Sequence, residues 1–327
     1  MRFPSSLRAI PMLLLAALLL PSLARLLAPV PAIAQDHQPL TTGYLLEEHA
    51  VKKVSDHVYV IPSRGRGAVP NVGIIVGSRA TLVVDTGMGP RSGEIIVREV
   101  QRLTKNPALY LVTTHFHPEH ISGEQAFPPN TVWIIPEAQK EDIDQSAMRY
   151  VNMFSQRSPE MKALLQDVKL REPDIVFDQE AKIDLGGVTA RVFWLGPAHT
   201  HGDTLVMVEE DSVLLPGDIV QNKLFPNMPD ATANVANWLV ILDKLEALHP
   251  RWIVPDHGDE TGDASLIGKE REVLKDLQTR SRELKAQGKS AEEAGQTLTA
   301  EFKTKYPDWT NPNAINNIVL RCYAESQ

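Results

Sequence analysis

Cysteine is almost absent from this chain of 327 residues, which contains only Cys322. A single cysteine excludes an intrachain disulfide, so the hydrophobic core, and any bound metal, must stabilise the fold. With 43% hydrophobic residues, a core for one large α/β domain is available. Cys322 lies outside every motif described below, and we interpret it as a packing residue and not as a nucleophile.

Positive charge is also scarce. Lysine and arginine number 33 against 41 acidic residues, which gives a net charge of −8. So acidic a chain is a poor candidate for binding nucleic acid or an anionic membrane surface. We therefore expect a small-molecule substrate. No internal repeat or low-complexity tract is present, and the sequence leaves the oligomeric state open.

Residues 1–34 contain no acidic residue and have the layout of a secretory signal peptide. Arg2 and Arg8 precede the apolar run 12–20, which is short for a bilayer span, and Ala32-Ile33-Ala34 offers small residues for cleavage. Cleavage after Ala34 would also remove Arg25, leaving 30 basic against 41 acidic residues, a net charge of −11. We predict an exported protein, periplasmic or secreted, with no membrane association after cleavage. A retained N-terminal anchor is the alternative.

The densest group of possible ligands is His115-Phe116-His117-Pro118-Glu119-His120, which follows the apolar run 109–112. Neutral imidazoles and a carboxylate are the ligands that zinc prefers. A buried strand that ends in a short loop could hold them rigidly. A chance cluster of surface histidines is the alternative. Three later segments repeat the pattern of a strand followed by a possible ligand, which favours a metal site: His199, Asp218 and His257.

The H-x-H-x-E-H pattern resembles the H-x-H-x-D-H signature of the metallo-β-lactamase-fold hydrolases. The family's other motifs occur in the expected order: Val83-Val84-Asp85-Thr86-Gly87, Gly196-Pro197-Ala198-His199-Thr200, Leu215-Pro216-Gly217-Asp218 and Val254-Pro255-Asp256-His257-Gly258. One departure is Glu119, where the family usually has aspartate. The resemblance implies an α/β (α+β) fold, a four-layer αβ/βα sandwich with helices outside.

After the signal peptide we expect three parts: a mobile lead-in at 35–57, the metallo-β-lactamase-like domain at 58–262, and a helical C-terminal extension of that domain at 263–327. Short strands such as 80–85 are apolar on both faces, which suits a sheet covered by helices. The extension contains a capping box at 290–293 and no residue to which we assign chemistry.

The resemblance also implies two groups of metal ligands with a bridging aspartate: His115, His117 and His199; Glu119, His120 and His257; and Asp218 between them. Three imidazoles would leave an open position on the first metal. Two metals could share a hydroxide, which makes Glu119 and Asp218 the acidic residues closest to the chemistry. The longer Glu119 side chain could shift or weaken the second metal. We expect two zinc ions per chain, with iron or manganese as alternatives.

Two acidic residues, Asp85 and Asp203, are candidates for orienting the metal ligands by hydrogen bonds without binding the metal themselves. Asp85 could fix the tautomer of an imidazole in the first histidine loop, or it could be a turn residue that bonds its own backbone. Asp203 has the same two interpretations. His201 could be a proton shuttle at the cleft or a solvent-exposed histidine.

Two segments could form the cleft. The helical stretch 136–170 either borders the substrate or packs only on the outside. The loop 220–233 either provides an apolar wall through Leu224, Phe225 and Met228, or places these side chains in the core.

The favoured function is a zinc-dependent hydrolase that uses a metal-bound hydroxide to cleave an ester, thioester, lactone or lactam. A class B β-lactamase is one alternative. One lactamase subclass, however, has a metal-binding cysteine at the position of Asp218, whereas an aspartate there is more like glyoxalase II and the lactonases. An iron-dependent persulfide dioxygenase is another. The complete ligand set argues against a non-catalytic binding protein.

Overall fold

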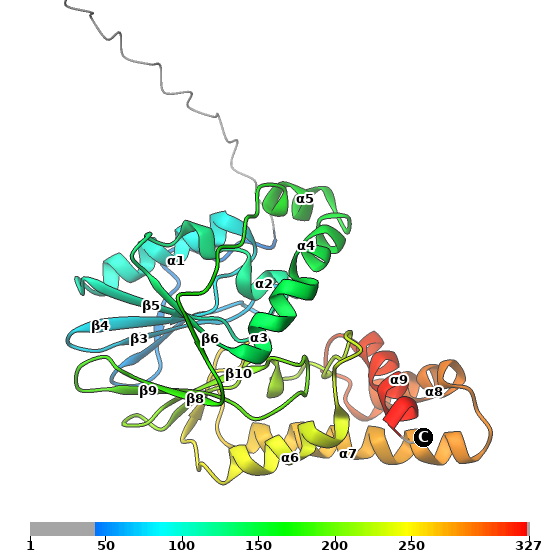
Figure 1. Ribbon diagram of the computed structural model, residues 1–327. Helices are drawn as coiled ribbons and strands as arrows, with labels where there is room; N and C mark the ends of the chain where they lie inside the picture. Colours follow the sequence, from blue (N-terminus) through cyan, green and yellow to red (C-terminus); the bar gives the residue numbers. More distant parts are fainter. Residues whose placement is uncertain (1–42, 326–327) are drawn as a thin grey trace, which may run out of the picture. The chain divides into compact units, whose positions relative to one another are not determined.

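The computed structural model describes residues 43–325, so the expected signal peptide and the start of the lead-in lie outside the described residues. The first sheet has seven strands in chain order: β1 Lys52–Lys53, β2 Val58–Ile61, β3 Val72–Val76, β4 Ala80–Val84, β5 Ala108–Val112, β6 Val132–Pro136 and β7 Ile175–Phe177 (Figure 1). Strands β1 to β4 are antiparallel and strands β4 to β7 are parallel. Parallel neighbours require crossovers, which the helices of this half provide.

The second sheet has five strands in the order β12-β11-β10-β9-β8: β8 Glu180–Asp184, β9 Thr189–Trp194, β10 Thr204–Val208, β11 Val213–Leu215 and β12 Trp252–Ile253. Gly186 and Gly187 have positive φ and make the predicted hairpin turn between β8 and β9. Only β11 and β12 pair in parallel, and helix α6 (Val235–Glu246) makes their crossover. The 3-10 turn η3 (Gly217–Ile219) follows β11 directly.

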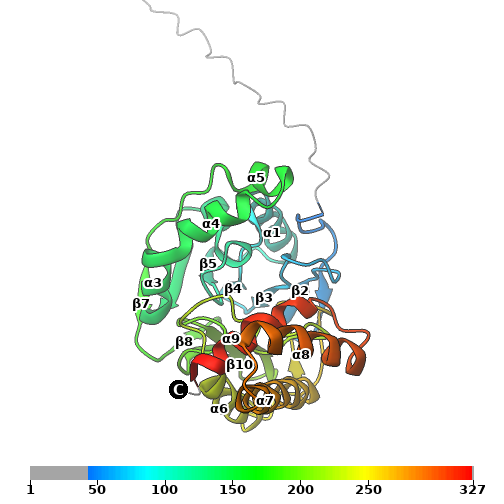
Figure 2. The same cartoon turned by 90° about the vertical axis from the view of Figure 1, so that its right-hand side faces the viewer.

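Helices cover the outer face of each sheet (Figure 2). The first sheet is covered by α1 Gly89–Leu103, α2 Pro118–Ile121, η1 Glu124–Ala126, α3 Glu137–Asp142, the π-helical η2 Ile143–Ala147, α4 Met148–Ser155 and α5 Pro159–Leu165. Helix α6 packs on the second sheet with the C-terminal extension, which comprises α7 Ser265–Ala286, α8 Ala291–Lys305, η4 Pro312–Ala314 and α9 Ile315–Glu325. Strands β4 and β10 are buried at every position, as expected for sheets covered on both faces. The predicted α/β sandwich with added C-terminal helices is confirmed.

The described part of the lead-in belongs to the folded unit, which corrects the expectation of a mobile segment. Leu46 is buried, and Lys52 of β1 lies opposite Val60 of β2. Asp211, in the hairpin between β10 and β11, accepts hydrogen bonds from the Ser55 hydroxyl and the His57 backbone. A two-residue edge strand of lysines has no apolar pattern, so β1 could not be predicted from the sequence.

The C-terminal extension contains the predicted capping box. The Ser290 hydroxyl accepts from the Glu293 backbone, and the Glu293 carboxylate accepts from the Ser290 backbone. None of the helices within residues 43–325 has both the length and the apolar character that a bilayer crossing requires.

Candidate metal centre

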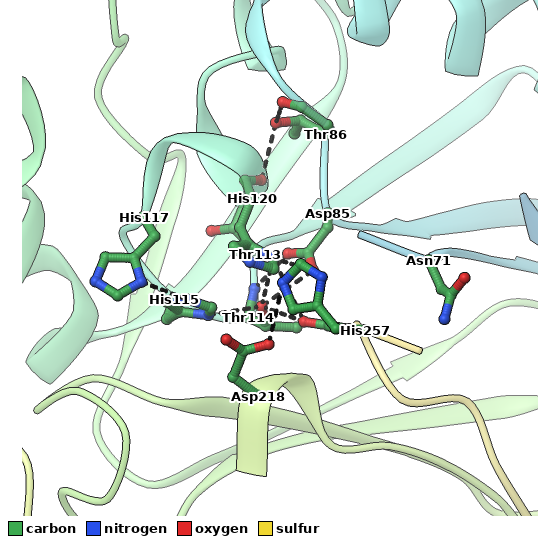
Figure 3. A network of polar contacts seen from close by, with 12 residues as sticks. Asn71, Asp85, Thr86, Thr113, Thr114, His115, His117, His120, Asp218 and His257 are labelled. Atoms are coloured by element: carbon green, nitrogen blue, oxygen red, sulfur yellow. Dashed lines mark hydrogen bonds and ion pairs between the residues drawn. The ribbon is translucent and has the colours of Figure 1, made fainter. Parts of the chain in front are cut away.

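All seven predicted ligands follow strand ends, and all are buried. His115 and His117 lie in the loop between β5 and α2, Glu119 and His120 lie in the short helix α2, and His199 lies between β9 and β10. Asp218 lies in η3 after β11, and His257 follows β12. Because these strand ends meet at one edge of the two sheets, ligands separated widely in sequence face one another (Figure 3).

The first group consists of His115, His117 and His199. His115 Nε2 lies 3.0 Å from His117 Nδ1, which lies 3.2 Å from His199 Nε2, so the three nitrogens face one point. Burial and the neighbouring histidines hold the pKa of His115 and of His117 well below the ordinary value. These two imidazoles are therefore neutral at pH 7, which is the form that binds metal.

The second group consists of Glu119, His120 and His257, whose ligand atoms lie within 4.8 Å of one another. Asp218 lies between the groups: Oδ2 is 3.4 Å from His199 Nε2, and Oδ1 is 3.5 Å from His257 Nε2. Burial raises the pKa of Asp218, but the surrounding histidines lower it further, so this group is a carboxylate. One oxygen is thus directed toward each group.

Hydrogen-bond partners on the far side of the rings fix which nitrogen is free. His199 Nδ1 lies 2.6 Å from the carbonyl oxygen of Asn227, and His257 Nδ1 lies 3.2 Å from that of Val69. Nδ1 therefore carries the proton in both rings, and Nε2 keeps its lone pair for a metal.

Asp85 adopts a left-handed backbone conformation, with φ of 72°. Its carboxylate accepts hydrogen bonds from the Thr114 backbone at 2.7 Å and the Thr114 hydroxyl at 3.0 Å, and lies 2.9 Å from His120 Nδ1. Burial lowers the pKa of His120, but Asp85, Asp256 and Asp218 together raise it, to about 10. A metal bound at Nε2 of His120 would displace the proton that this nitrogen carries in the charged ring. The side chain of Asp85 thus contacts the ligand loop, and its non-glycine left-handed conformation is the kind of strain found at functional sites.

Asp203 lies behind His199. Its carboxylate accepts from the backbone of Ala198 at 3.2 Å and of Thr200 at 2.9 Å, so it shapes the loop that carries the ligand. His201 is not among the residues that line the cavity described below, and its Nδ1 lies 3.8 Å from Glu141.

Asp256 is a residue that the sequence reasoning missed. It is buried, and its Oδ2 lies 2.9 Å from the Thr114 hydroxyl oxygen and 3.4 Å from His120 Nδ1. Burial and the charge of Asp85 raise its pKa well above the ordinary value. Its position directly before His257 in the last motif was a signal that could have identified it.

The donor atoms fit metal ions. Four of their buried polar atoms have no hydrogen-bond partner among the described residues: His117 Nε2, Glu119 Oε2, His120 Nε2 and Asp218 Oδ1. Buried polar atoms are rarely left unpaired, because each costs about 1–3 kcal/mol. A cation coordinated by Glu119, His120 and Asp218 would satisfy three of the four.

A cavity of 530 Å³ opens above these ligands. The helical stretch 136–170 contributes Tyr150, Met153, Phe154 and Arg157 to the cavity wall, so the prediction that this stretch borders the cleft is confirmed. The C-terminal extension also lines the cavity, through Asp308, Thr310 and Asn311. This corrects the expectation that the extension has no role at the site. Pairing of Leu224 with Thr310 brings this distant segment to the cavity.

The substrate-wall hypothesis is wrong for Phe225 and Met228. Phe225 is fully buried and packs against aromatic side chains of the extension, with its ring centroid 5.2 Å from that of Trp309. Met228 belongs to the same core. Leu224, in contrast, lines the cavity.

A family model described as the metallo-beta-lactamase superfamily matches residues 65–257, which include all seven ligands. The chain belongs to the metallo-β-lactamase superfamily. The predicted family and its metal-dependent hydrolase activity are thereby confirmed, since members of this superfamily are metal-dependent hydrolases.

Two curated relatives are similar to this superfamily member. The acyl-coenzyme A thioesterase MBLAC2 of Homo sapiens is 25% identical over 189 residues, which cover 54% of this chain and 67% of the relative. The linear primary-alkylsulfatase of Pseudomonas sp. (strain ATCC 19151) is 21% identical over 207 residues, which cover 54% of this chain and 39% of the relative. The matched part therefore spans well under half of the sulfatase.

Solved structures show the same fold. A metallo-beta-lactamase from Pontibacter korlensis has a TM-score of 0.56 and 20% identity, and the match covers 69% of this chain and 98% of that one. The stereoselective inverting sec-alkylsulfatase Pisa1 from Pseudomonas sp. has a TM-score of 0.66 and 15% identity, with 83% and 50% covered.

Proposed function

We propose that this superfamily member is a two-zinc hydrolase that cleaves an ester or thioester bond, with a lactone or lactam as related substrates. The position of Asp218 is the main support, because each carboxylate oxygen is directed toward a different histidine group. A single metal would need only one group.

The chain's residues have distinct roles in this proposal. His115, His117 and His199 would hold one zinc ion, and His120, His257 and Glu119 the other, with Asp218 bridging. Bound zinc would supply water with a pKa of about 7 and would polarise the bond to be cleaved. Asp85 and Asp203 keep the ligand loops in place, and the cavity wall orients the substrate.

The apolar wall favours substrates with an acyl or alkyl chain. Met153, Phe154 and Leu224 offer it hydrophobic surface beside the ligands. The names of the two curated relatives, an acyl-coenzyme A thioesterase and a linear alkylsulfatase, fit such a chain. A sulfate ester of an alkyl alcohol is the second candidate.

The test compares purified protein on hexanoyl thioester, p-nitrophenyl hexanoate, sodium dodecyl sulfate and the β-lactam nitrocefin, with metal content measured on the same sample. We expect zinc, and the highest kcat/KM on the thioester or the carboxylic ester. His117→Ala should abolish turnover and lower metal content, whereas the exposed His249→Asn should change neither. Preference for nitrocefin, or iron with oxygen uptake on a persulfide, would contradict the proposal.

A further inference from the structure

Arg157 is a cation of the cavity wall. It follows α4, and its guanidinium lies over the Phe154 ring, 3.4 Å from the centroid. None of the ion pairs within 4.0 Å among residues 43–325 involves it. Its charge acts on both Glu119 and His117, which places it on the side of the cavity near the metal ligands.

Arg66 is a second such cation, in the loop between β2 and β3. Its Nε donates to the Ser63 carbonyl oxygen at 3.1 Å, while its Nη2 is buried and has no hydrogen-bond partner among the described residues. The same loop carries Val69, whose carbonyl oxygen orients His257. Arg66, Glu119 and His257 line the same cavity, and Nη2 of Arg66 is left as a donor for a ligand.

The third cation of the wall differs from these two. Lys223 has Asp259 at 4.0 Å and Asp308 at 3.9 Å, and all three line the cavity. Its charge is therefore balanced within the protein. Among the described residues, Arg157 and Arg66 are thus the cations of the wall that form no ion pair within 4.0 Å.

We infer that the substrate carries an anionic group, a carboxylate or a phosphate, at a distance from the bond that is cleaved, and that Arg157 and Arg66 bind it. Guanidinium groups match both anions because their donors form a planar fork. Stacking on Phe154 orients the fork of Arg157. Tyr150 and Met153 of the same wall would contact the apolar part of the substrate. The inference rests on the proposed function, since it concerns the substrate of that hydrolysis.

Two matched pairs of substrates test the inference and separate the two sources of the anion. The p-nitrophenyl monoester of adipic acid carries a carboxylate on the acyl side, and p-nitrophenyl 6-methylheptanoate is its neutral counterpart of similar size. Hexanoyl-coenzyme A carries phosphates on the leaving-group side, and the hexanoyl thioester of N-acetylcysteamine lacks them. The readout is the ratio of kcat/KM for the charged compound to that for the neutral compound.

For at least one pair, Arg157→Gln should lower this ratio by about 10- to 100-fold, the usual effect of losing a charge-assisted hydrogen bond. Arg66→Gln should lower the ratio for the same pair, and Arg157→Lys should lie between wild type and Arg157→Gln. The matched control is Arg149→Gln, which removes the same charge from α4 outside the cavity wall and should leave both ratios unchanged.

Equal ratios in wild type and Arg157→Gln for both pairs would overturn the inference while hydrolysis itself persists. A loss of bound metal in Arg157→Gln would also overturn it, because Arg157 would then be a positioning residue for Glu119. If wild type hydrolyses none of the four compounds, the proposed function fails, and the inference fails with it.

Discussion

This chain departs from the usual family pattern at Glu119. The ligand atoms of Glu119, His120 and His257 nevertheless lie within 4.8 Å of one another. Glu119→Gln should weaken the second metal about tenfold or more, because the neutral amide is a poorer ligand than a carboxylate. Metal content per chain should fall from two toward one, and kcat should fall with it. Retention of two metals by the Gln variant at limiting zinc would show that Glu119 is not a ligand.

Asp142 gives a pH dependence at the same scale. Its carboxylate accepts from the Gly202 backbone at 2.8 Å, and burial raises its pKa to about 7. Because the raised pKa favours the neutral form, the stability that Asp142 contributes is complete below its ordinary pKa and is lost as the pH rises through about 7.

Asp142→Asn should therefore be more stable than wild type at pH 8 by about 1 kcal/mol or more, and should show little gain at pH 4. Melting temperatures across this range measure the effect in metal-loaded protein. A gain of equal size at both pH values would rule out the titration of Asp142 as its cause.

At the scale of elements, the loop after η3 divides its side chains between core and cavity. Phe225→Ala should cost about 3–5 kcal/mol of unfolding free energy, because the fully buried ring leaves a hole among aromatic neighbours. Kinetic constants of the folded fraction should stay near wild type. Leu224→Ala should do the reverse, raising KM for apolar substrates with a small change in Tm. Identical behaviour of the two variants would contradict this division.

Elements with a strong local signal could be predicted from the sequence. β4 is a buried run of five residues of which four are apolar, and the capping box at Ser290 defines a helix start. β1 could not be predicted, because two lysines become a strand only by pairing with β2. The Phe225 side chain points into the core because the C-terminal extension packs over it, and this contact could not be predicted from the sequence of the loop.

The metal ligands could be proposed because their types and order matched a family pattern. The structure adds what that pattern does not contain. Asp256 belongs to the site because it contacts Thr114 and His120. Asn227 orients His199 through a backbone carbonyl, which any residue could supply. Such contacts depend on the packing of distant segments and not on residue type.

At the scale of the whole molecule, a fold without a disulfide encloses a group of acids and histidines that a metal would neutralise. Removal of metal with EDTA should lower Tm by about 5–10 °C, which corresponds to a few kcal/mol for a domain of this size. Added zinc should restore Tm. Calorimetry on apo and reloaded protein measures the change, and an unchanged Tm after verified metal removal would contradict this role.

The N-terminal leader is predicted from sequence alone. Expressed in a Gram-negative host, the chain should be cleaved after Ala34 and recovered with Gln35 as its first residue. Intact mass and N-terminal sequencing of a periplasmic fraction provide the measurement. An uncleaved chain in the membrane fraction would favour the retained anchor instead.

The two sheets share the metal ligands unequally, and this has a consequence for the order of assembly. The 115–120 segment lies before β7, whereas His199, Asp218 and His257 come from the second half of the chain. During synthesis, the first four ligands emerge long before the partners that complete their geometry. The complete ligand set therefore exists only after both halves of the chain have docked. We expect a chain whose second sheet is not docked to the first to lack hydrolase activity.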